Sequence, residues 1–476
     1  MKDKKKSILF CILIFVPICL YSFLLKVDVG DEIINMQSIV KMLNGNLIYK
    51  DFNVIITPLF FYIGKTILTL FGKNIFVFRI YNVLIYEFLF IALYKLLKKL
   101  NIKEEIAQLG ILFILVLSTI FIQVGANYNI LAIAFYILGI SLYKKDDNVK
   151  NILLQGILMF LVFWTKQNVG VYYVLAICLS NVILDKKEQI IKNILLTLKE
   201  ISIFGSCVLI LCVAMYLHGN LFEFVDYAFL GMKDFTNNNL IIGSEISSII
   251  FIFLIASLLI DVLYIYYMKK GEIVTLQEKS ILIFSIFLNL TAFPIVNMYH
   301  LSFAIILNFV MLLVIINKTD IKSTKIILPI TLIIYVAINV NACCYLLKNK
   351  NLELILNKDS KFFGGFVNTE LLKEINEVDT YIQEEEEKGN KVIIFSEKSP
   401  LYMIELNKNN GILDLPFNGN LGRKGVSGLI EKIQNMNNVK VLLNEEPFWQ
   451  IPLKAREYVL LNMKKIGEVG EFSIYE

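Results

Sequence analysis

The chain has 476 residues, of which 57% are hydrophobic and 18% are charged, and its mean hydropathy is +0.66. Soluble domains carry roughly 25% charged residues, so this composition argues against a purely soluble enzyme. Residues 1–348 hold 30 basic and 21 acidic residues, whereas residues 349–476 hold 16 and 20. We therefore expect an apolar body at 1–348 and a polar domain at 349–476; the small net charge gives no indication of a nucleic-acid partner.

The apolar body divides into runs of helix length. An apolar run from Ile8 to Leu25 follows the basic residues 2–6 and lacks a small-x-small cleavage site, which predicts an uncleaved first span with a cytoplasmic N-terminus. Two later runs, 151–165 and 169–184, are shorter than the roughly 20 residues of a crossing and predict a tightly linked helix pair. We expect about eleven transmembrane helices in all, the later ten at 76–97, 106–124, 128–143, 151–165, 169–184, 195–217, 246–268, 279–297, 301–316 and 325–346.

Lysines gather in alternate loops and predict the orientation. The loops that would be cytoplasmic contain residues 95–99, 144–145, 186–187 and 269–270, with Lys318 and Lys322. The opposite loops around 125–127, 166–168, 218–245 and 298–300 hold only Lys166 and Lys233 as cations. Positive charge favours the cytoplasmic side. A crossing at 54–72 would reverse this pattern, so we expect an interfacial helix there. The chain is therefore predicted to be a multi-pass plasma-membrane protein with an extracytoplasmic C-terminal domain.

The polar residues 349–476 predict a small α/β domain. Helices are expected at 369–388, 425–436 and 452–463, and strands at 391–396, 439–444 and 471–475. The glycines between 411 and 428 have neither of the standard spacings of a phosphate-binding loop.

The first outer loop, residues 26–75, is unusually acidic where it leaves the first span. Asp28, Asp31 and Glu32 follow that span directly, and acids so close to a membrane should face water or a cation. One interpretation is a solvated loop whose helix is capped by Asp31. The other is a functional site.

Several motifs in this region resemble those of the GT-C membrane glycosyltransferases. The closest subgroup is that of the dolichyl-phosphate-mannose protein mannosyltransferases and the bacterial aminoarabinose transferase. The motifs are, in order, Asp31-Glu32, Gly45-x-x-x-Tyr49-x-Asp51, Pro58-Leu59-Phe60-x-Tyr62, Phe71-Gly72 and Arg79. The segment from Trp164 to Gly170 is also similar to a segment that the family carries between two short helices.

This resemblance implies transfer of a sugar from a polyprenyl-phosphate donor to a cell-envelope glycan, lipid or protein at the outer face of the membrane. Asp31 matches the family's catalytic carboxylate and would accept the proton of the attacking hydroxyl. Lys166 and Arg79 would bind the departing lipid phosphate, although Lys166 could instead extend to the membrane interface. Glu32 and Asp51 would be supporting polar groups.

Two further positions complete the predicted site. Many relatives carry a second acid between the third and fourth spans, often near a metal or the acceptor. Here residues 123–129 offer amides and no carboxylate. The sequence therefore leaves the question of a divalent metal open and gives no support for one. Asn127 is predicted to bind substrate instead. His300, at an outer turn, is either structural or a contact to phosphate or sugar.

Two other classes of membrane protein compete with this prediction. A flippase or transporter of lipid-linked sugars should show internal repeats and broken helices in corresponding positions, and no repeat is evident. A polysaccharide polymerase usually has its large outer loop late in the chain, whereas residues 218–245 form a modest one.

Overall fold

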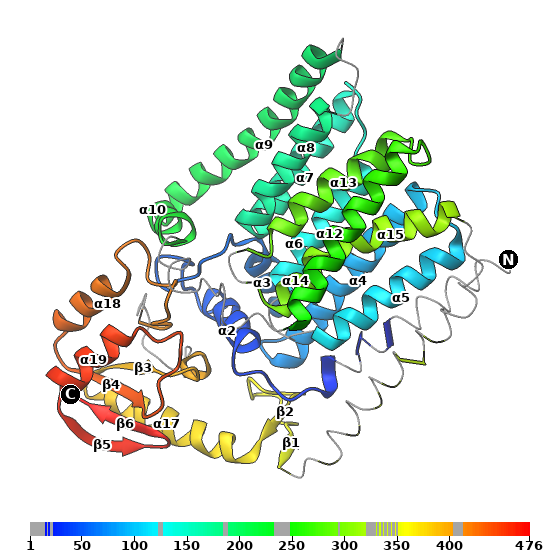
Figure 1. The fold of residues 1–476 in the computed structure, drawn as a ribbon. Helices are drawn as coiled ribbons and strands as arrows, with labels where there is room; N and C mark the ends of the chain where they lie inside the picture. Colours follow the sequence, from blue (N-terminus) through cyan, green and yellow to red (C-terminus); the bar gives the residue numbers. More distant parts are fainter. Residues whose placement is uncertain are drawn as a thin grey trace.

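The computed structural model describes residues 22–121, 127–183, 189–232, 248–293, 296–319, 351–402 and 413–476, with single residues between 15 and 19 and between 330 and 348. An array of apolar helices lies beside a smaller part in which helices flank a mixed sheet (Figure 1). The predicted spans at 8–25 and 325–346 lie mostly outside the described residues.

The helical array is formed by the middle of the chain. Three of its described helices are long and apolar enough to cross a membrane, and five shorter apolar helices accompany them, so the total of about eleven crossings stays a prediction. The elements are α4 (Ile75–Lys99), α5 (Glu104–Phe121), α6 (Asn127–Leu142), α7 (Val149–Thr165), α8 (Gln167–Ile183), α9 (Ile190–His218), α10 (Leu221–Val225), the π-helix η2 (Asp226–Leu230), α12 (Ser248–Lys269), α13 (Leu276–Leu290), α14 (Met298–Ala304) and α15 (Ile306–Thr319).

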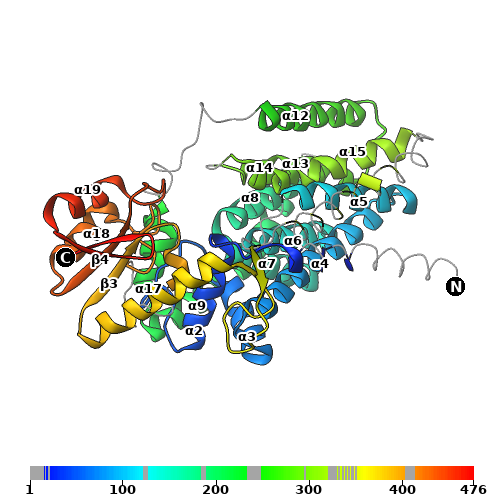
Figure 2. The ribbon, with the colours of Figure 1, turned by 90° about the horizontal axis from the view of Figure 1, so that it is seen from below.

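Burial separates central from peripheral helices. In its most apolar window α4 is 67% buried, whereas the corresponding windows of α9 and α12 are 6% and 17% buried. Figure 2 shows α12 at the edge of the array. The outward leucine and isoleucine side chains of α9 and α12 suit contact with lipid, because apolar residues all around a helix are stable only in an apolar environment.

The helices α7 and α8 form the short linked pair that the sequence predicts. Only Lys166 separates them, and its backbone N–H still donates to Val162 O at 3.0 Å. An added Cβ on Gly170 would lie 2.6 Å from the Phe163 backbone nitrogen, so the absence of a side chain permits this close approach. The turn places Lys166 at the common end of both helices.

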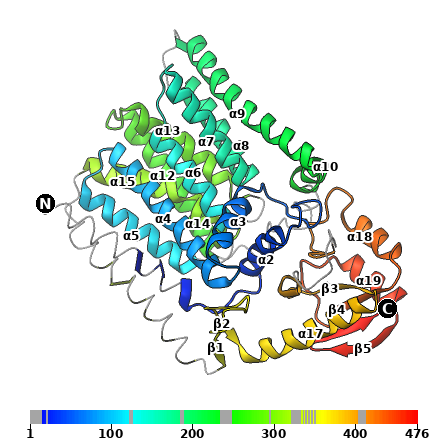
Figure 3. The ribbon, with the colours of Figure 1, turned by 180° about the vertical axis from the view of Figure 1, so that it is seen from behind.

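The first outer loop folds into two helices, α2 (Asp31–Leu43) and α3 (Leu59–Phe71). The helix α3 buries Phe60, Phe61 and Leu68 but leaves Phe71 71% exposed; its location at a membrane surface stays a prediction. The helix α2 is buried along almost its whole length, polar residues included. Figure 3 shows why: it lies between the helical array and the C-terminal sheet.

The C-terminal part is a mixed α/β fold with a four-stranded sheet of order β3-β4-β6-β5. Strands β3 and β4 are parallel, with Lys391 opposite Val439, and β6 is antiparallel to both β4 and β5. Its elements are β1 (Leu352–Leu354), β2 (Phe366–Asn368), α17 (Thr369–Glu387), β3 (Lys391–Phe395), the 3-10 helix η3 (Ser399–Tyr402), α18 (Gly425–Gln434), β4 (Val439–Asn444), α19 (Leu453–Asn462), β5 (Lys465–Val469) and β6 (Phe472–Tyr475). The predicted helices and strands all form there, while β1, β2 and the mostly exposed edge strand β5 were not predicted.

The two parts are joined through the first outer loop. Backbone hydrogen bonds run from Val27 N to Phe366 O at 2.8 Å and from Ile75 N to Lys361 O at 2.9 Å. Lys41 of α2 forms a buried ion pair with Asp414. The loop is therefore held between membrane helices on one side and the sheet on the other.

Candidate active site

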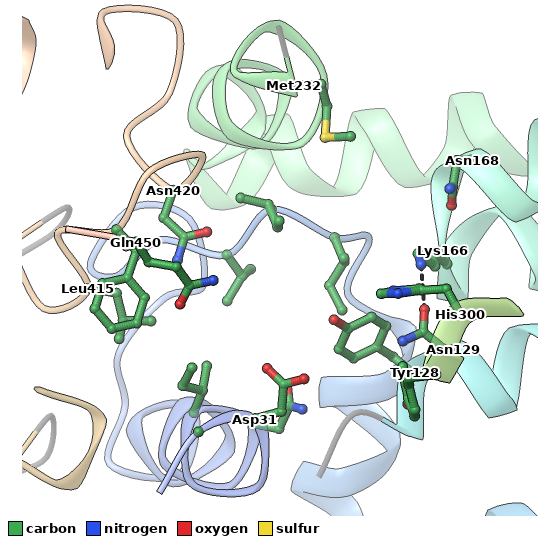
Figure 4. A pocket seen from close by; sticks show the side chains of 18 of the residues that line it. Asp31, Tyr128, Asn129, Lys166, Asn168, Met232, His300, Leu415, Asn420 and Gln450 are labelled. Atoms are coloured by element: carbon green, nitrogen blue, oxygen red, sulfur yellow. Dashed lines mark hydrogen bonds between the residues drawn. The ribbon is translucent and has the colours of Figure 1, made fainter. Parts of the chain in front are cut away.

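A cavity of about 420 Å³ opens where the first outer loop, the helical array and the C-terminal part meet. Its size lies within the range of about 300–1,000 Å³ usual for ligand pockets. Charged residues are few in its lining: Asp28, Asp31 and Lys166. Figure 4 shows Asp31 between Lys166, His300, Asn129 and Tyr128 on one side and Asn420 and Gln450 on the other.

Asp31 is the first residue of α2 rather than its cap. The N-cap position is Gly30, and it makes no side-chain cap hydrogen bond, so the capping role considered for Asp31 is wrong. The pKa of Asp31 is raised to about 6, mainly by burial and also by the neighbouring Asp28 carboxylate, while the Lys166 charge acts in the opposite direction. At neutral pH the carboxylate is ionised and is a stronger base than an ordinary aspartate.

Lys166 lies in the turn between α7 and α8, where Nζ donates to Asn129 Oδ1 and lies 5.7 Å from the centre of the Tyr128 ring. Burial lowers the pKa of Lys166 to about 8, an effect that the Asp31 charge opposes. The ammonium is thus mostly protonated at neutral pH and poorly solvated. An anion entering the cavity would be attracted to it strongly, because charges interact more strongly out of bulk water.

His300 is a hydrogen-bond acceptor in this arrangement. The Asn297 oxygen Oδ1 lies 2.9 Å both from the His300 backbone nitrogen and from Nδ1, so Nδ1 carries the hydrogen and Nε2 keeps a lone pair. Burial, with the Lys166 charge, lowers the pKa of His300 to about 3. The neutral ring with a free Nε2 suits a hydroxyl donor better than a phosphate oxygen.

The turn at Lys166 is fixed to the first outer loop by its neighbour Gln167. Its Nε2 donates to Ile55 O at 2.7 Å and to Ala228 O at 2.9 Å, and its Oε1 accepts from Thr57 N at 3.3 Å. This buried amide therefore sets how the α7–α8 turn lies relative to the loop that carries Asp31.

Glu32 and Arg79 bind each other instead of lining the cavity. Arg79 is 0% exposed, and its Nε and Nη2 lie 2.7 Å and 3.0 Å from the two oxygens of Glu32. Its Nη1 donates to Leu25 O at 2.9 Å. Such bidentate pairs fix geometry, and this one ties α4 to the start of α2. The geometry thus leaves Arg79 poorly placed for the phosphate binding that we expected of it.

Asp51 and Asn127 also lie outside the cavity lining. Asp51 Oδ2 accepts from Leu47 N at 2.6 Å and closes a turn of the first outer loop. Asn127, at the start of α6, is 0% exposed, and no described group is bonded to its amide; the preceding residues 122–126 lie outside the description. The amide that contacts Lys166 belongs to Asn129, two residues after the predicted Asn127.

The wall of the cavity opposite Lys166 was not predicted from the sequence. It consists of residues from two C-terminal loops, which we call the C-terminal wall: Leu415, Phe417, Asn418, Asn420, Trp449 and Gln450. These loops follow the carboxyl ends of β3 and β4, the edge where α/β folds usually bind ligands. The available signal was the pair of predicted strands at 391–396 and 439–444, each followed by a loop.

For a divalent metal the cavity offers only part of a ligand set. No three His, Cys, Asp or Glu side chains gather among the residues that the structure describes. Asp28 and Asp31 are the two carboxylates that could hold a cation together with substrate phosphate oxygens, as Mg²⁺ sites do. Lys166 already supplies positive charge to the same space.

Comparison with known proteins gives a result at the level of the fold. No protein-family model and no curated protein matches the chain. The oligosaccharyltransferase of Archaeoglobus fulgidus, solved in complex with zinc and sulfate, is structurally similar with a TM-score of 0.50 and 12% identity, covering 90% of this chain and 68% of that one. This similarity shows that the chain shares the overall fold of that transferase, in agreement with the expected GT-C-like architecture. The subgroup, the donor and the acceptor stay predictions.

Proposed function

We propose that the chain is an integral membrane glycosyltransferase that moves a sugar from a polyprenyl-phosphate donor to a cell-envelope acceptor at the outer face of the membrane. The observation that carries this proposal is the cavity in which Asp31, with its raised pKa, faces Lys166. A base and a cation on two sides of one small space are what transfer from a lipid phosphate requires. The fold similarity and the apolar helices agree with it.

The reaction follows from the positions of these groups. The acceptor hydroxyl loses its proton to the Asp31 carboxylate as its oxygen bonds to the anomeric carbon of the donor sugar. The bond from that carbon to the phosphate oxygen breaks, and the electron pair leaves with the lipid phosphate. Lys166 stabilises the charge that develops there. A single displacement of this kind inverts the anomeric configuration.

Other residues act by binding or positioning. The free Nε2 of His300 accepts a hydrogen bond from a sugar hydroxyl, and Asn129 orients Lys166. The Glu32–Arg79 pair keeps the first turn of α2 in place, which determines where Asp31 lies.

Complementation of a deletion strain tests the proposal. We expect strains that lack the gene, or carry Asp31→Asn, to lose one envelope glycan structure and to accumulate the corresponding polyprenyl-phosphate sugar. The control is Asp359→Asn, which neutralises an exposed acid outside the cavity and should restore the glycan. Restoration by Asp31→Asn would disprove the assignment of the base. Loss of lipid-linked sugar movement across the membrane, with transfer intact, would instead identify a transporter.

A further inference from the structure

We propose that the C-terminal wall is a saccharide subsite and that the acceptor of this enzyme is itself a sugar chain. This inference rests on the proposed function and specifies its acceptor. It is carried by the location, the chemistry and the fixed geometry of the wall.

The wall lies across the cavity from the cation. In Figure 4, Asn420 and Gln450 are on one side of Asp31 and Lys166 is on the other. A donor phosphate belongs beside Lys166, because that is where the positive charge is. The attacking hydroxyl must reach Asp31 from the remaining side, so the C-terminal wall contacts the acceptor.

The chemistry of the wall is aromatic and neutral. Trp449 is 57% exposed, and its ring continues a series of edge contacts in which Phe448 lies 5.9 Å from Trp449 and 5.7 Å from Phe417. The polar side chains are amides: Asn418, Asn420 and Gln450. None of the six residues of the wall is charged.

These two kinds of group match the surface of a pyranose. Each sugar ring has an apolar face of C–H groups that packs on an aromatic ring. Its hydroxyls both donate and accept, and carboxamides can satisfy both roles. A peptide acceptor has no such repeated pattern, and an anionic acceptor would require a cation on this wall.

The wall is also held rigidly, so little ordering is needed on binding. Asn418 N donates to Gln450 O at 2.6 Å, which joins the two loops. Asn53 of the first outer loop donates through Nδ2 to the backbone oxygens of Asn420 and, at 3.4 Å, Leu415. The Lys41–Asp414 pair fixes the same loop to α2. The acceptor subsite therefore keeps a set position relative to Asp31.

A binding experiment that needs no turnover tests this inference. The full-length protein in nanodiscs, without donor, is applied to an array of envelope-type and plant oligosaccharides, and ligands found there are titrated by isothermal titration calorimetry, which gives an affinity for every variant. The variants are Trp449→Ala, Trp449→Phe and the control Leu461→Ala, an 83% exposed side chain outside the cavity.

We expect at least one class of oligosaccharide to bind to the wild type and to Leu461→Ala with the same affinity. Trp449→Ala should weaken that binding about tenfold, and Trp449→Phe should restore most of it, because a ring face remains. No binding to any oligosaccharide, or unchanged binding to Trp449→Ala, overturns the subsite. The Asp31→Asn protein should still bind the sugar, so a failed transfer reaction and a failed subsite give different results.

Discussion

The raised pKa of Asp31 makes a quantitative prediction about pH. If Asp31 is the base, the rate follows its ionised fraction, which for a pKa of about 6 is about nine-tenths at pH 7 and about one-tenth at pH 5. The rate of transfer should therefore fall about tenfold over this interval as the pH is lowered. An aspartate of ordinary pKa would lose little activity there.

The structure also indicates which substitution should shift this fall in rate, which we call the acidic limb of the pH profile, to another pH. Asp28 raises the pKa of Asp31, so Asp28→Asn should shift the limb to lower pH while keeping an oxygen that can accept from Gly30 N, as Asp28 Oδ1 does at 3.1 Å. The assay is release of polyprenyl phosphate in isolated membranes, with Asp359→Asn as the control that leaves the limb in place. A limb near pH 4 in the wild type, or one that Asp28→Asn does not move, would refute the assignment.

Burial of this carboxylate has a matching cost in stability. The pKa of Asp31 is about 6 in the folded chain against about 3.8 for an ordinary aspartate, so the folded state binds this proton more tightly than the unfolded state. The resulting stabilisation is complete below about pH 4 and is lost as the pH rises through about 6. At pH 8, Asp31→Asn should therefore raise the free energy of unfolding by roughly 1–3 kcal/mol, measured as a higher melting temperature, while transfer is lost.

Three further substitutions test the remaining roles. Lys166→Gln should lower kcat by roughly 10²–10³-fold with little change in stability, as expected on removing one group that stabilises developing charge; an unchanged kcat would exclude it from phosphate stabilisation. Arg79→Ala should cost about 3–5 kcal/mol of stability, because it leaves Glu32 buried without its partner. The measurement is a lower melting temperature in detergent. Loss of donor binding in a protein of unchanged stability would contradict the positioning role. Asp414→Ala should leave Lys41 buried without its partner and increase proteolysis of the C-terminal loops, and protection equal to the wild type would argue against that anchor.

Some features of the site were accessible from the sequence because they depend on local order along the chain. Asp31 follows the first span at once, and Lys166 lies between two apolar runs that are too short to be separate crossings. Both residues line the cavity. Local spacing is enough here, because a short helix pair must present its turn at one common end.

Other residues were assigned roles that three-dimensional packing changes. Arg79 looked available to a phosphate, but Glu32, 47 positions earlier, takes up its guanidinium. Asn127 and Asn129 are equivalent by composition, and only the orientation of α6 brings the second to Lys166. Neither choice can be made from spacing, since it depends on which side of a helix meets its neighbours.

By itself the sequence indicated a membrane protein, since its apolar runs reflect the free energy of placing residues in a bilayer. It also indicated the small α/β fold at the end of the chain, because alternating apolar strands and amphipathic helices are local patterns. Only the tertiary structure decided that this fold closes the cavity opposite Lys166. Residues such as Asn53 and Asn420 meet across more than 360 positions of chain, and no local pattern records a contact of that range.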